Sequence, residues 1–264
     1  MIIDLLKSLV LGAVQGFTEF LPISSTAHLI IGVRWMNLPM SSFMKSYIII
    51  IQLASILAVV IFFWKKLWSN PWIYFKKLLV AFIPTAVIGF LAYNLVKNFL
   101  QESLAIIALA LLLGGVLMLK LERRYSEKNK DNLVDNLDIS SISYWQCFLI
   151  GIFQSLAIIP GVSRSAATIL GGLSLGIRRL LIVEFSFFLA IPTMLAASSL
   201  DLIKSEFNFS SSELIFLGVG FIASFFVAWL SIKFLLNFIK KYNFNPFAWY
   251  RIIFGTLVLS YLYL

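Results

Sequence analysis

The chain has 264 residues, of which 61% are apolar, and its mean hydropathy is +0.96. This composition excludes an ordinary soluble domain and predicts a polytopic all-α membrane protein, because several apolar runs approach or exceed the roughly 20 residues that cross a bilayer. The net charge of +9 comes from basic residues in loops between apolar runs, which argues against nucleic-acid binding. The single cysteine, Cys147, excludes an internal disulfide and a cysteine metal cluster.

The first apolar region, 2–33, is interrupted by Pro22 and by a cluster of hydroxyl side chains. Asp4 and Glu19 also lie in this region, and no small-residue cleavage site follows it, so we expect a part of the mature protein rather than a signal peptide. Because proline removes a backbone donor and clashes with the preceding turn, we expect a helix that enters the membrane, breaks and returns. Such backbone is tolerated only where protein covers it or water lines it.

The second broken region, 145–177, has the same character around Pro160 and Gly161. We therefore expect two re-entrant helical hairpins. Six full spans are predicted from uninterrupted apolar runs, at about 47–64, 77–95, 103–121, 181–203, 212–236 and 246–264.

The distribution of Lys and Arg predicts the orientation of the chain. Most of these residues fall in loops that share one side, which the positive-inside rule assigns to the cytoplasm and which places both termini outside. The polar segment 122–141 is expected to be a cytoplasmic connector within a single transmembrane domain, between halves at about 1–125 and 140–264. The basic loops are 65–76, 120–130, 178–179 and 233–241.

The two broken regions align without a gap at a constant offset of 139 residues. Because three full spans separate them, the second copy starts from the opposite face, which makes an inverted repeat. Such repeats place a site near the midplane, between broken helices. The matched pairs are Gly12 with Gly151, Gln15 with Gln154, Ser24 with Ser163, Ala27 with Ala166, and Gly32 with Gly171.

Each break is followed by what reads as a new helix N-terminus. Ser24, Ser25 or Thr26 could cap the first helix, and Ser163 the second. Both N-termini are expected to point toward one central cavity, where free N–H groups and the helix dipole favour an anion, phosphate especially. Arg164 lies in the second break, and its planar guanidinium suits a phosphate; the competing interpretation is an arginine that snorkels or pairs with a carboxylate.

Glu19 follows Gln15 by four residues, on one helix face. Glu19 could act as a base or hold a divalent cation with help from Gln15, and the alternative is a structural ion pair with Arg164 or Arg251. His28 is the only histidine. It could attack phosphorus directly or serve as the base for Ser25, and the alternative is a packing residue.

Three other polar residues in apolar sequence have mainly structural interpretations. Gln154 is expected to make a polar contact between helices. Glu184 and Arg251 lie on separate predicted spans and could pair with each other.

At these residues the chain resembles the undecaprenyl-diphosphatases, the bacitracin-resistance phosphatases of bacterial membranes (BacA/UppP). The resemblance covers nearly the whole chain. It rests on LGAVQGFTEFLPISSTAHL at 11–29, IQLASILAVV at 51–60, PGVSRSAAT at 160–168, EFSFFLAIP at 184–192 and PFAWYR at 246–251.

The resemblance implies hydrolysis of undecaprenyl diphosphate to the monophosphate and inorganic phosphate, which recycles the lipid carrier for peptidoglycan and confers bacitracin resistance. It implies a divalent cation, Mg²⁺ or Ca²⁺, held by Glu19 and by Gln15, which stands where many members have Glu. The expected catalytic residues are Glu19, Ser25, His28 and Arg164. The expected phosphate-binding residues are Ser24, Thr26, Gly161, Ser163, Arg164, Ser165 and Thr168.

A multi-pass protein of the bacterial inner membrane follows from this resemblance, with its site opening to the periplasmic side and a polyprenyl diphosphate lipid as substrate. Membrane lipids are the other expected partners, and a homodimer is kept as an option. A transporter of lipid phosphate is the rival hypothesis, since inverted repeats with broken helices are typical of transporters. Transport needs anion binding but not a nucleophile and a base together, so Glu19, Ser25 and His28 favour an enzyme.

Overall fold

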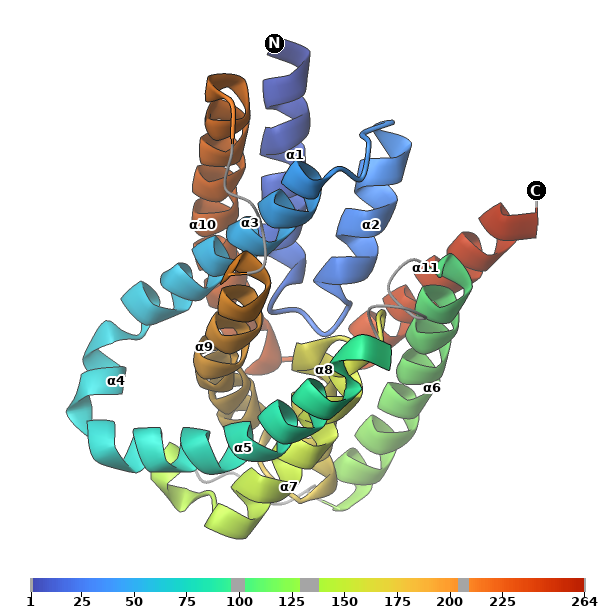
Figure 1. The fold of residues 1–264 in the computed structure, drawn as a ribbon. Coiled ribbons are helices and arrows are strands. Elements are labelled where there is room, and N and C mark those ends of the chain that lie inside the picture. The colour runs from blue at the N-terminus through green and yellow to red at the C-terminus, as the bar shows by residue number, and fades with distance from the viewer. Residues whose placement is uncertain (1, 96–102, 129–137, 204–208, 264) are drawn as a thin grey trace.

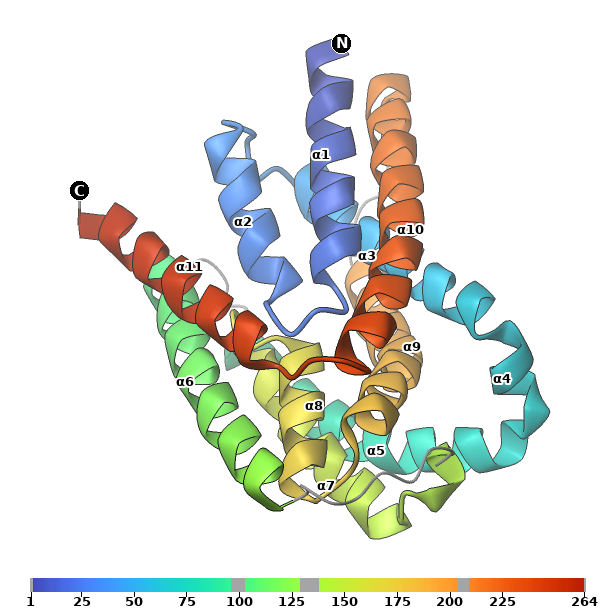
Figure 2. The ribbon, with the colours of Figure 1, turned by 180° about the vertical axis from the view of Figure 1, so that it is seen from behind.

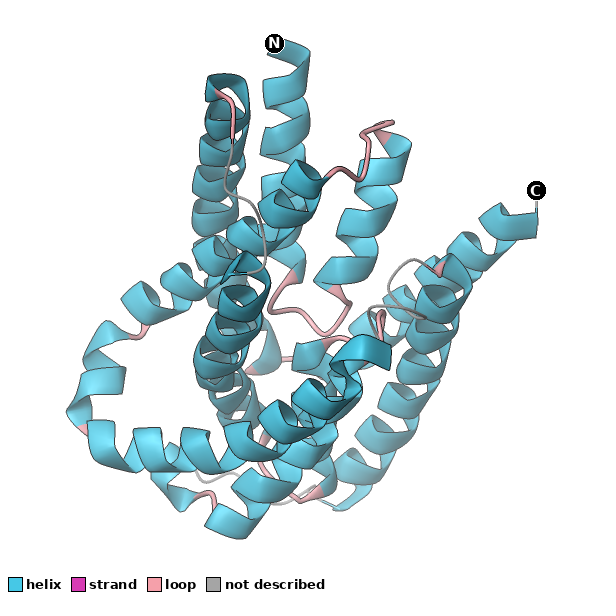
Figure 3. Ribbon diagram, in the orientation of Figure 1, coloured by secondary structure: helices cyan, strands magenta, loops and turns pink. Residues whose placement is uncertain are grey.

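The structure, a computed structural model, describes residues 2–95, 103–128, 138–203 and 209–263. Within these ranges all regular structure is helical, with no strand (Figure 3), which confirms the predicted all-α class. The elements are α1 (Ile2–Thr18), α2 (Ser25–Trp35), α3 (Ser42–Phe62), α4 (Trp64–Ser69), α5 (Pro71–Leu95), α6 (Leu104–Lys128), η2 (Ile139–Ser141), α7 (Tyr144–Ser155), η3 (Leu156–Ile158), α8 (Arg164–Ser174), α9 (Arg179–Ile203), α10 (Ser211–Ile239) and α11 (Asn245–Tyr263).

Several helices begin at serine caps that the sequence provides. The Ser41 side chain accepts a hydrogen bond from the Met44 amide at the start of α3. Ser143 and Gln146 form a reciprocal capping box at the start of α7, and Ser210 forms one with Glu213 at the start of α10. These caps satisfy backbone donors that no preceding turn can satisfy.

All six predicted spans are helical, although their ends differ by several residues. Five helices, α3, α5, α6, α9 and α10, are long and apolar enough to cross a membrane. The expected sixth span, α11, is a helix but does not belong to that group. Its sequence interrupts the apolar run with polar residues, among them Tyr250 and Arg251. The structure therefore confirms a polytopic membrane protein and leaves the sixth crossing as a prediction.

Both broken regions are interrupted where the sequence predicted. The first break, residues 19–24, separates α1 from α2, and the second break, residues 159–163, separates η3 from α8. Figure 1 shows α2 running back beside α1 after the first break, and Figure 2 shows the same arrangement from behind. Entry into a membrane and return from it stay predictions, because helix geometry alone does not define the bilayer.

Two of the helix–helix contacts are related to each other by the repeat offset of 139 residues. Helix α1 packs against α10, and α7 packs against α5. In the first pair the Gly12 backbone lies against Gly220, and in the second Gly151 lies against Ala81, so both contacts relate residues of the two copies at one offset. Small residues of this kind let helix backbones approach closely. This pairing agrees with the predicted repeat, and the inversion of its second copy stays a prediction.

The centre of the fold is α9, whose apolar residues contact both halves of the chain (Figure 1). The side chains of Phe185, Phe187 and Phe188 are fully buried there. Phe187 packs edge-on against Phe20, and Phe188 packs edge-on against Phe63, a favourable arrangement of aromatic quadrupoles.

Two segments assigned to loops are helical instead. Helix α6 continues to Lys128, so the connector predicted at 122–141 begins as helix, and 129–137 lie outside the described residues. The basic segment 65–76 forms α4 and the start of α5. Lys77, which directly follows this segment, is buried and donates to the carbonyls of Ser140 and Ile142. The methylene groups of a lysine can be buried against apolar neighbours, although a hydropathy scale counts the whole residue as polar. A lysine-rich segment can therefore form a packed helix.

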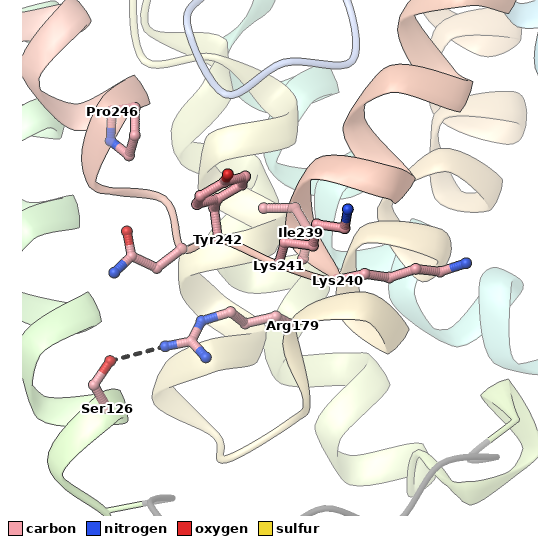
Figure 4. A pocket seen from close by; sticks show the side chains of 8 residues that line it. Ser126, Arg179, Ile239, Lys240, Lys241, Tyr242 and Pro246 are labelled. Carbon is pink, nitrogen blue, oxygen red and sulfur yellow. Dashed lines mark hydrogen bonds between the residues drawn. The ribbon is translucent and has the colours of Figure 1, made fainter.

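Three of the predicted basic segments meet at one end of the molecule. Ser126, Arg179, Lys240 and Lys241 line one hollow there (Figure 4). Both chain termini lie toward the opposite end in Figure 1. This arrangement is the one that the distribution of positive charge predicted, and the assignment of the basic end to the cytoplasm stays a prediction.

The glycine contacts generate a test of the α7–α5 packing. A Cβ on Gly151 would collide with the Ala81 carbonyl, whereas a Cβ on Gly218 would meet nothing within 4 Å. We expect Gly151→Ala to lower the free energy of unfolding by about 1–3 kcal/mol, as overpacking does. Gly218→Ala should raise it by up to about 1 kcal/mol, because alanine favours helix. Unfolding in detergent measures both, and equal changes of the same sign would contradict the packing.

Candidate active site

The carboxylate of Glu19 organises the first break. Glu19 is 6% exposed, and its backbone amide donates to the Gln15 carbonyl. Its Oε2 atom accepts hydrogen bonds from Gln15 Nε2 at 2.9 Å and from Ser25 Oγ at 2.6 Å. The end of α1 and the start of α2 are thus joined through a single carboxylate oxygen.

Arg164, the first residue of α8, brings the second break to the same carboxylate. Its Nη2 atom lies 3.2 Å from Glu19 Oε1, and its Nη1 atom donates to the Ser186 carbonyl at 2.7 Å on α9. The guanidinium also lies over the Phe20 ring, 5.9 Å from the centroid. We call Gln15, Glu19, Ser25 and Arg164 the Glu19 cluster. It unites predicted residues that are up to 149 positions apart.

Two buried atoms in the Glu19 cluster have no hydrogen-bond partner among the described residues. They are Gln15 Oε1, an acceptor, and Arg164 Nε, a donor. The orientation of the Gln15 amide is fixed by charge, because exchanging its atoms would place an oxygen against Glu19 Oε2. Buried polar groups without partners are costly. The cluster therefore retains one acceptor and one donor for a polar ligand.

The serines that precede α2 and α8 share an unusual backbone conformation. Ser24 has φ 73° and Ser163 has φ 74°, in the left-handed region that few residues other than glycine adopt. The two are matched positions of the repeat. The predicted cap by Ser163 is confirmed, since its Oγ accepts from the Ala166 amide. Ser24 occupies the N-cap position, but its side chain makes no capping hydrogen bond. Such strain is characteristic of functional sites.

Arg251 fastens both breaks to α6. It is fully buried, and its Nη1 atom donates to the carbonyls of Pro22 and Val162, each at 3.1 Å. Its remaining donors reach the carbonyls of Gly161, Leu111 and Ala110. The proposed pairing of Arg251 with Glu184 was therefore wrong.

Glu184 instead accepts from Lys66 Nζ at 2.5 Å. The two residues come from α9 and α4, so the carboxylate pairs with a lysine of the basic segment 65–76. The sequence did not predict this pair, because Lys66 and Glu184 are far apart in the chain and come together only through the position of α4 beside α9.

His28 is held by a different set of contacts. Its Nδ1 atom lies 2.7 Å from the Ser24 carbonyl, so Nδ1 carries the proton. Its Nε2 atom lies 2.6 Å from the Tyr250 hydroxyl, and the Phe254 ring stacks on the imidazole with centroids 4.4 Å apart. The hydrogen bond of Ser25 goes to Glu19, so the described geometry does not make His28 the base for Ser25.

The remaining predicted phosphate-binding residues lie in three settings. Ser163 and Ser165 share a hydrogen bond of 3.0 Å, and Ser165 also donates to the Leu21 carbonyl across the breaks. Thr168 is fully buried, and its single hydroxyl proton is shared between Arg164 O at 2.9 Å and Gln154 Oε1 at 3.3 Å. Thr26 is exposed.

Gly161 has φ 95°, and its carbonyl is one of the acceptors of Arg251. A Cβ there would collide with the backbone of Ile107. Glycine is therefore required at this point both by its conformation and by the close approach of α6.

The polar contact expected for Gln154 is confirmed. Its amide donates to Thr85 on α5 at 2.9 Å, while its oxygen accepts from Thr168. Gln154 is the matched position of Gln15, yet both its amide nitrogen and its amide oxygen have hydrogen-bond partners. The two copies have thus diverged, and only the first retains a free amide oxygen.

The described residues contain no group of three or more His, Cys, Asp and Glu side chains that could hold a metal ion. The oxygen ligands at the Glu19 cluster are one carboxylate and one amide. Hard cations such as Mg²⁺ need only one or two protein carboxylates when a substrate phosphate and water complete the shell. The cluster fits an ion shared with a phosphate and does not fit an independent metal centre.

Sequence reasoning missed Tyr250, Phe254 and Ser186 as parts of the site. Tyr250 and Phe254 are four residues apart on α11 and therefore share a helix face. Tyr250 is also the neighbour of Arg251. Two adjacent polar side chains inside an apolar helix could have indicated that this part of α11 belongs to the site. Ser186 acts through its carbonyl, which no side-chain pattern reveals.

The Glu19–Arg164 contact predicts strong coupling in a double-mutant cycle. Glu19→Gln and Arg164→Gln should each lower the free energy of unfolding by about 3–5 kcal/mol, because each leaves a buried charge unpaired. The double variant should lose less than the sum. Chemical unfolding in detergent measures all four proteins.

The matched control for that cycle is Arg123 with Glu127. This ion pair has the same separation, 3.2 Å, but its side chains are 84% and 62% exposed. Its coupling should stay below about 0.5 kcal/mol. Equal coupling in the two cycles would contradict a dry Glu19 cluster.

The chain is similar to known proteins over nearly its whole length. Residues 8–257 match the family described as bacitracin resistance protein BacA. A protein of Campylobacter jejuni named undecaprenyl-diphosphatase is 49% identical over 260 residues, covering 98% of this chain and 94% of the relative. Proteins with the same name from Wolinella succinogenes and Aquifex aeolicus are 46% and 43% identical, with at least 97% of each chain covered. The chain belongs to the bacitracin resistance protein BacA family.

Proposed function

We propose that this protein hydrolyses undecaprenyl diphosphate to undecaprenyl phosphate and inorganic phosphate. The reaction recycles the lipid carrier for peptidoglycan and other envelope polymers and confers resistance to bacitracin. The observation that carries the proposal is the Glu19 cluster, in which a carboxylate, a hydroxyl and a guanidinium from both breaks meet in a buried site. The names of the relatives support the choice of substrate.

Arg164 is assigned to the phosphates of the substrate. Its Nε donor has no partner within the described part of the chain, and a guanidinium binds phosphate through parallel N–H groups. Ser163, the backbone N–H groups at the start of α8 and Thr168 are assigned to the same task, and Ser24, Thr26, Gly161 and Ser165 complete the phosphate-binding set. Positioning and charge stabilisation supply most of the catalysis in phosphoryl transfer.

Glu19 and Gln15 would hold a divalent cation, Mg²⁺ or Ca²⁺. The unpartnered Gln15 Oε1 and the Glu19 carboxylate support this assignment. When bound, such an ion neutralises charge that develops on the phosphate oxygens. Gln15 and Ser25 both donate to the Glu19 carboxylate and so fix its orientation. The position of the cation, and of the phosphate that shares it, would follow from this orientation.

The nucleophile is assigned to Ser25, with Glu19 as its base. Ser25 Oγ donates to Glu19 Oε2 at 2.6 Å, so the carboxylate can accept the hydroxyl proton as the oxygen attacks the terminal phosphorus. The bond from that phosphorus to the bridging oxygen breaks, and the lipid monophosphate leaves. Water then releases inorganic phosphate from the serine. The alternative is attack by His28, which must first release the Tyr250 hydroxyl from Nε2.

The site is assigned to the outer side of the bacterial cell membrane, with the polyprenyl tail among the spanning helices. The gathering of basic residues at the opposite end supports this orientation. A site that opens outward acts on diphosphate left after polymer export.

Phosphate release from undecaprenyl diphosphate by the purified protein tests the activity. We expect release that EDTA abolishes and added Mg²⁺ or Ca²⁺ restores. Arg164→Ala should lower turnover by about 10²–10³, as loss of a preorganised charge does. Arg123→Ala, which removes an exposed arginine, is the control and should retain turnover. Full turnover in Arg164→Ala would contradict the assignment.

Chemical trapping separates the two nucleophiles. After a brief reaction with terminally labelled substrate, we expect label in an acid-stable phosphoserine that Ser25→Ala removes and His28→Ala retains. An acid-labile label that depends on His28 would reverse the assignment, because phosphohistidine hydrolyses in acid.

Transport of lipid phosphate is the second candidate. The matched Gly12–Gly220 and Gly151–Ala81 contacts favour it, because inverted repeats are typical of transporters. Movement of labelled lipid monophosphate across vesicles, without phosphate release from the diphosphate, would favour transport over hydrolysis.

A further inference from the structure

A second polar site lies at the basic end of the molecule. A hollow of about 390 Å³ is lined by residues of α6, α9 and α10 and by the segment that leads into α11. Figure 4 shows Arg179 reaching Ser126 across it, beneath Tyr242. A neighbouring hollow of about 440 Å³ shares two lining residues with the first, Ser126 and Asn243. We call the two hollows together the basic groove.

Lys240 and Lys241 supply the positive charge that the basic groove leaves available. Both line the first hollow and are exposed. Among the described residues neither ammonium group has a hydrogen bond or an ion pair. Arg179, by contrast, is already used, since it donates to Glu122 and Ser126 and lies over the Tyr125 ring. The lysines are therefore free to bind an anion.

Glu122, although ion-paired with Arg179, supplies a carboxylate oxygen without a partner among the described residues, a short way along the basic groove. Its side chain lines the second hollow and is only 1% exposed. Its Oε1 atom accepts from Arg179 Nε at 2.8 Å, while the buried Oε2 atom has no partner in the described part of the chain. A buried carboxylate oxygen without a donor is costly. It offers a place for an N–H group with positive charge.

The position of the basic groove indicates that its ligand is a lipid headgroup. It lies where the apolar helices α6, α9 and α10 end or begin, and such ends lie at the level of the headgroups. Tyr242, 60% exposed at its rim, is a typical interfacial side chain. Leu117, in the middle of α6, and Phe234, near the end of α10, are also exposed and can contact acyl chains.

We propose that the basic groove binds a phospholipid whose headgroup carries both a phosphate and a primary ammonium, as phosphoethanolamine does. Lys240 and Lys241 bind the phosphate, and Glu122 Oε2 accepts a hydrogen bond from the ammonium. Each contact is a charge-assisted hydrogen bond. The basic groove shares no residue with the Glu19 cluster, so this inference does not depend on the proposed function.

A series of headgroups tests the ammonium contact without changing the protein. Delipidated protein in detergent is titrated with phosphatidylethanolamine, its N-methyl and N,N-dimethyl derivatives and phosphatidylcholine, all with the same acyl chains, and bound lipid is counted by native mass spectrometry. We expect affinity to fall as N–H groups are lost, by about tenfold from the first lipid to the last. Equal affinity across the series would overturn the proposal.

Variants locate the two contacts. Lys240→Gln with Lys241→Gln should weaken binding of every lipid in the series about tenfold. The control pair, Lys65→Gln with Lys76→Gln, removes the same charge from exposed lysines elsewhere on the basic end and should leave binding unchanged. Glu122→Gln should abolish the preference for the primary ammonium while binding of phosphatidylcholine persists. Equal losses from the two lysine pairs would overturn the assignment to the basic groove.

A soluble headgroup distinguishes a lipid from a free phosphate ester. Glycerophosphoethanolamine has the same charged groups but no acyl chains. We expect it to compete with the lipid at least tenfold more weakly, because the exposed apolar faces of α6 and α10 contribute only to the lipid. Competition as strong as that of the lipid would overturn the lipid assignment and identify a site for a soluble ester.

Discussion

The buried guanidinium of Arg251 is the interaction on which the arrangement of both breaks depends. Helix breaks leave backbone carbonyls without intrahelical partners, and a buried carbonyl without a donor is costly. Arg251 has five N–H donors, and the structure gives each of them a carbonyl, three in the breaks and two on α6. One side chain from α11 thus satisfies backbone groups of both copies of the repeat.

Once the breaks are held together, the Glu19 cluster follows. Ser165 donates across the breaks to Leu21, and Arg164 reaches Glu19. The ion pair cancels charge in a buried site, while Gln15 Oε1 and Arg164 Nε remain open to a ligand. Because electrostatic interactions strengthen in a low dielectric, Arg164 Nε is a favourable donor to a phosphate oxygen, whereas Gln15 Oε1 can only accept a hydrogen bond or coordinate a cation. The left-handed backbone of Ser24 and Ser163 is the local cost of this geometry.

Much of this architecture could be predicted from the sequence. Proline, glycine and hydroxyl clusters located both breaks, and apolar runs located the six long helices. Pairing in space could not be predicted, because side chains alone do not reveal which carbonyls a break exposes. The sequence therefore suggested that Arg251 pairs with Glu184. In the structure Arg251 donates to backbone oxygens, and Glu184 pairs with Lys66 on α4. For the same reason the sequence did not predict the contact of Tyr250 with His28, because these residues lie on different helices and are 222 positions apart.

The distance between the two breaks tests the role of Arg251 most directly. Nitroxide labels at Phe17→Cys and Leu156→Cys occupy exposed positions beside each break, and Cys147 is buried, so it stays unlabelled or is replaced by serine. Pulsed electron paramagnetic resonance should give one narrow distance distribution in the presence of Arg251. In Arg251→Met, with helix content retained, the account predicts a broad or displaced distribution. An unchanged narrow distribution would contradict it.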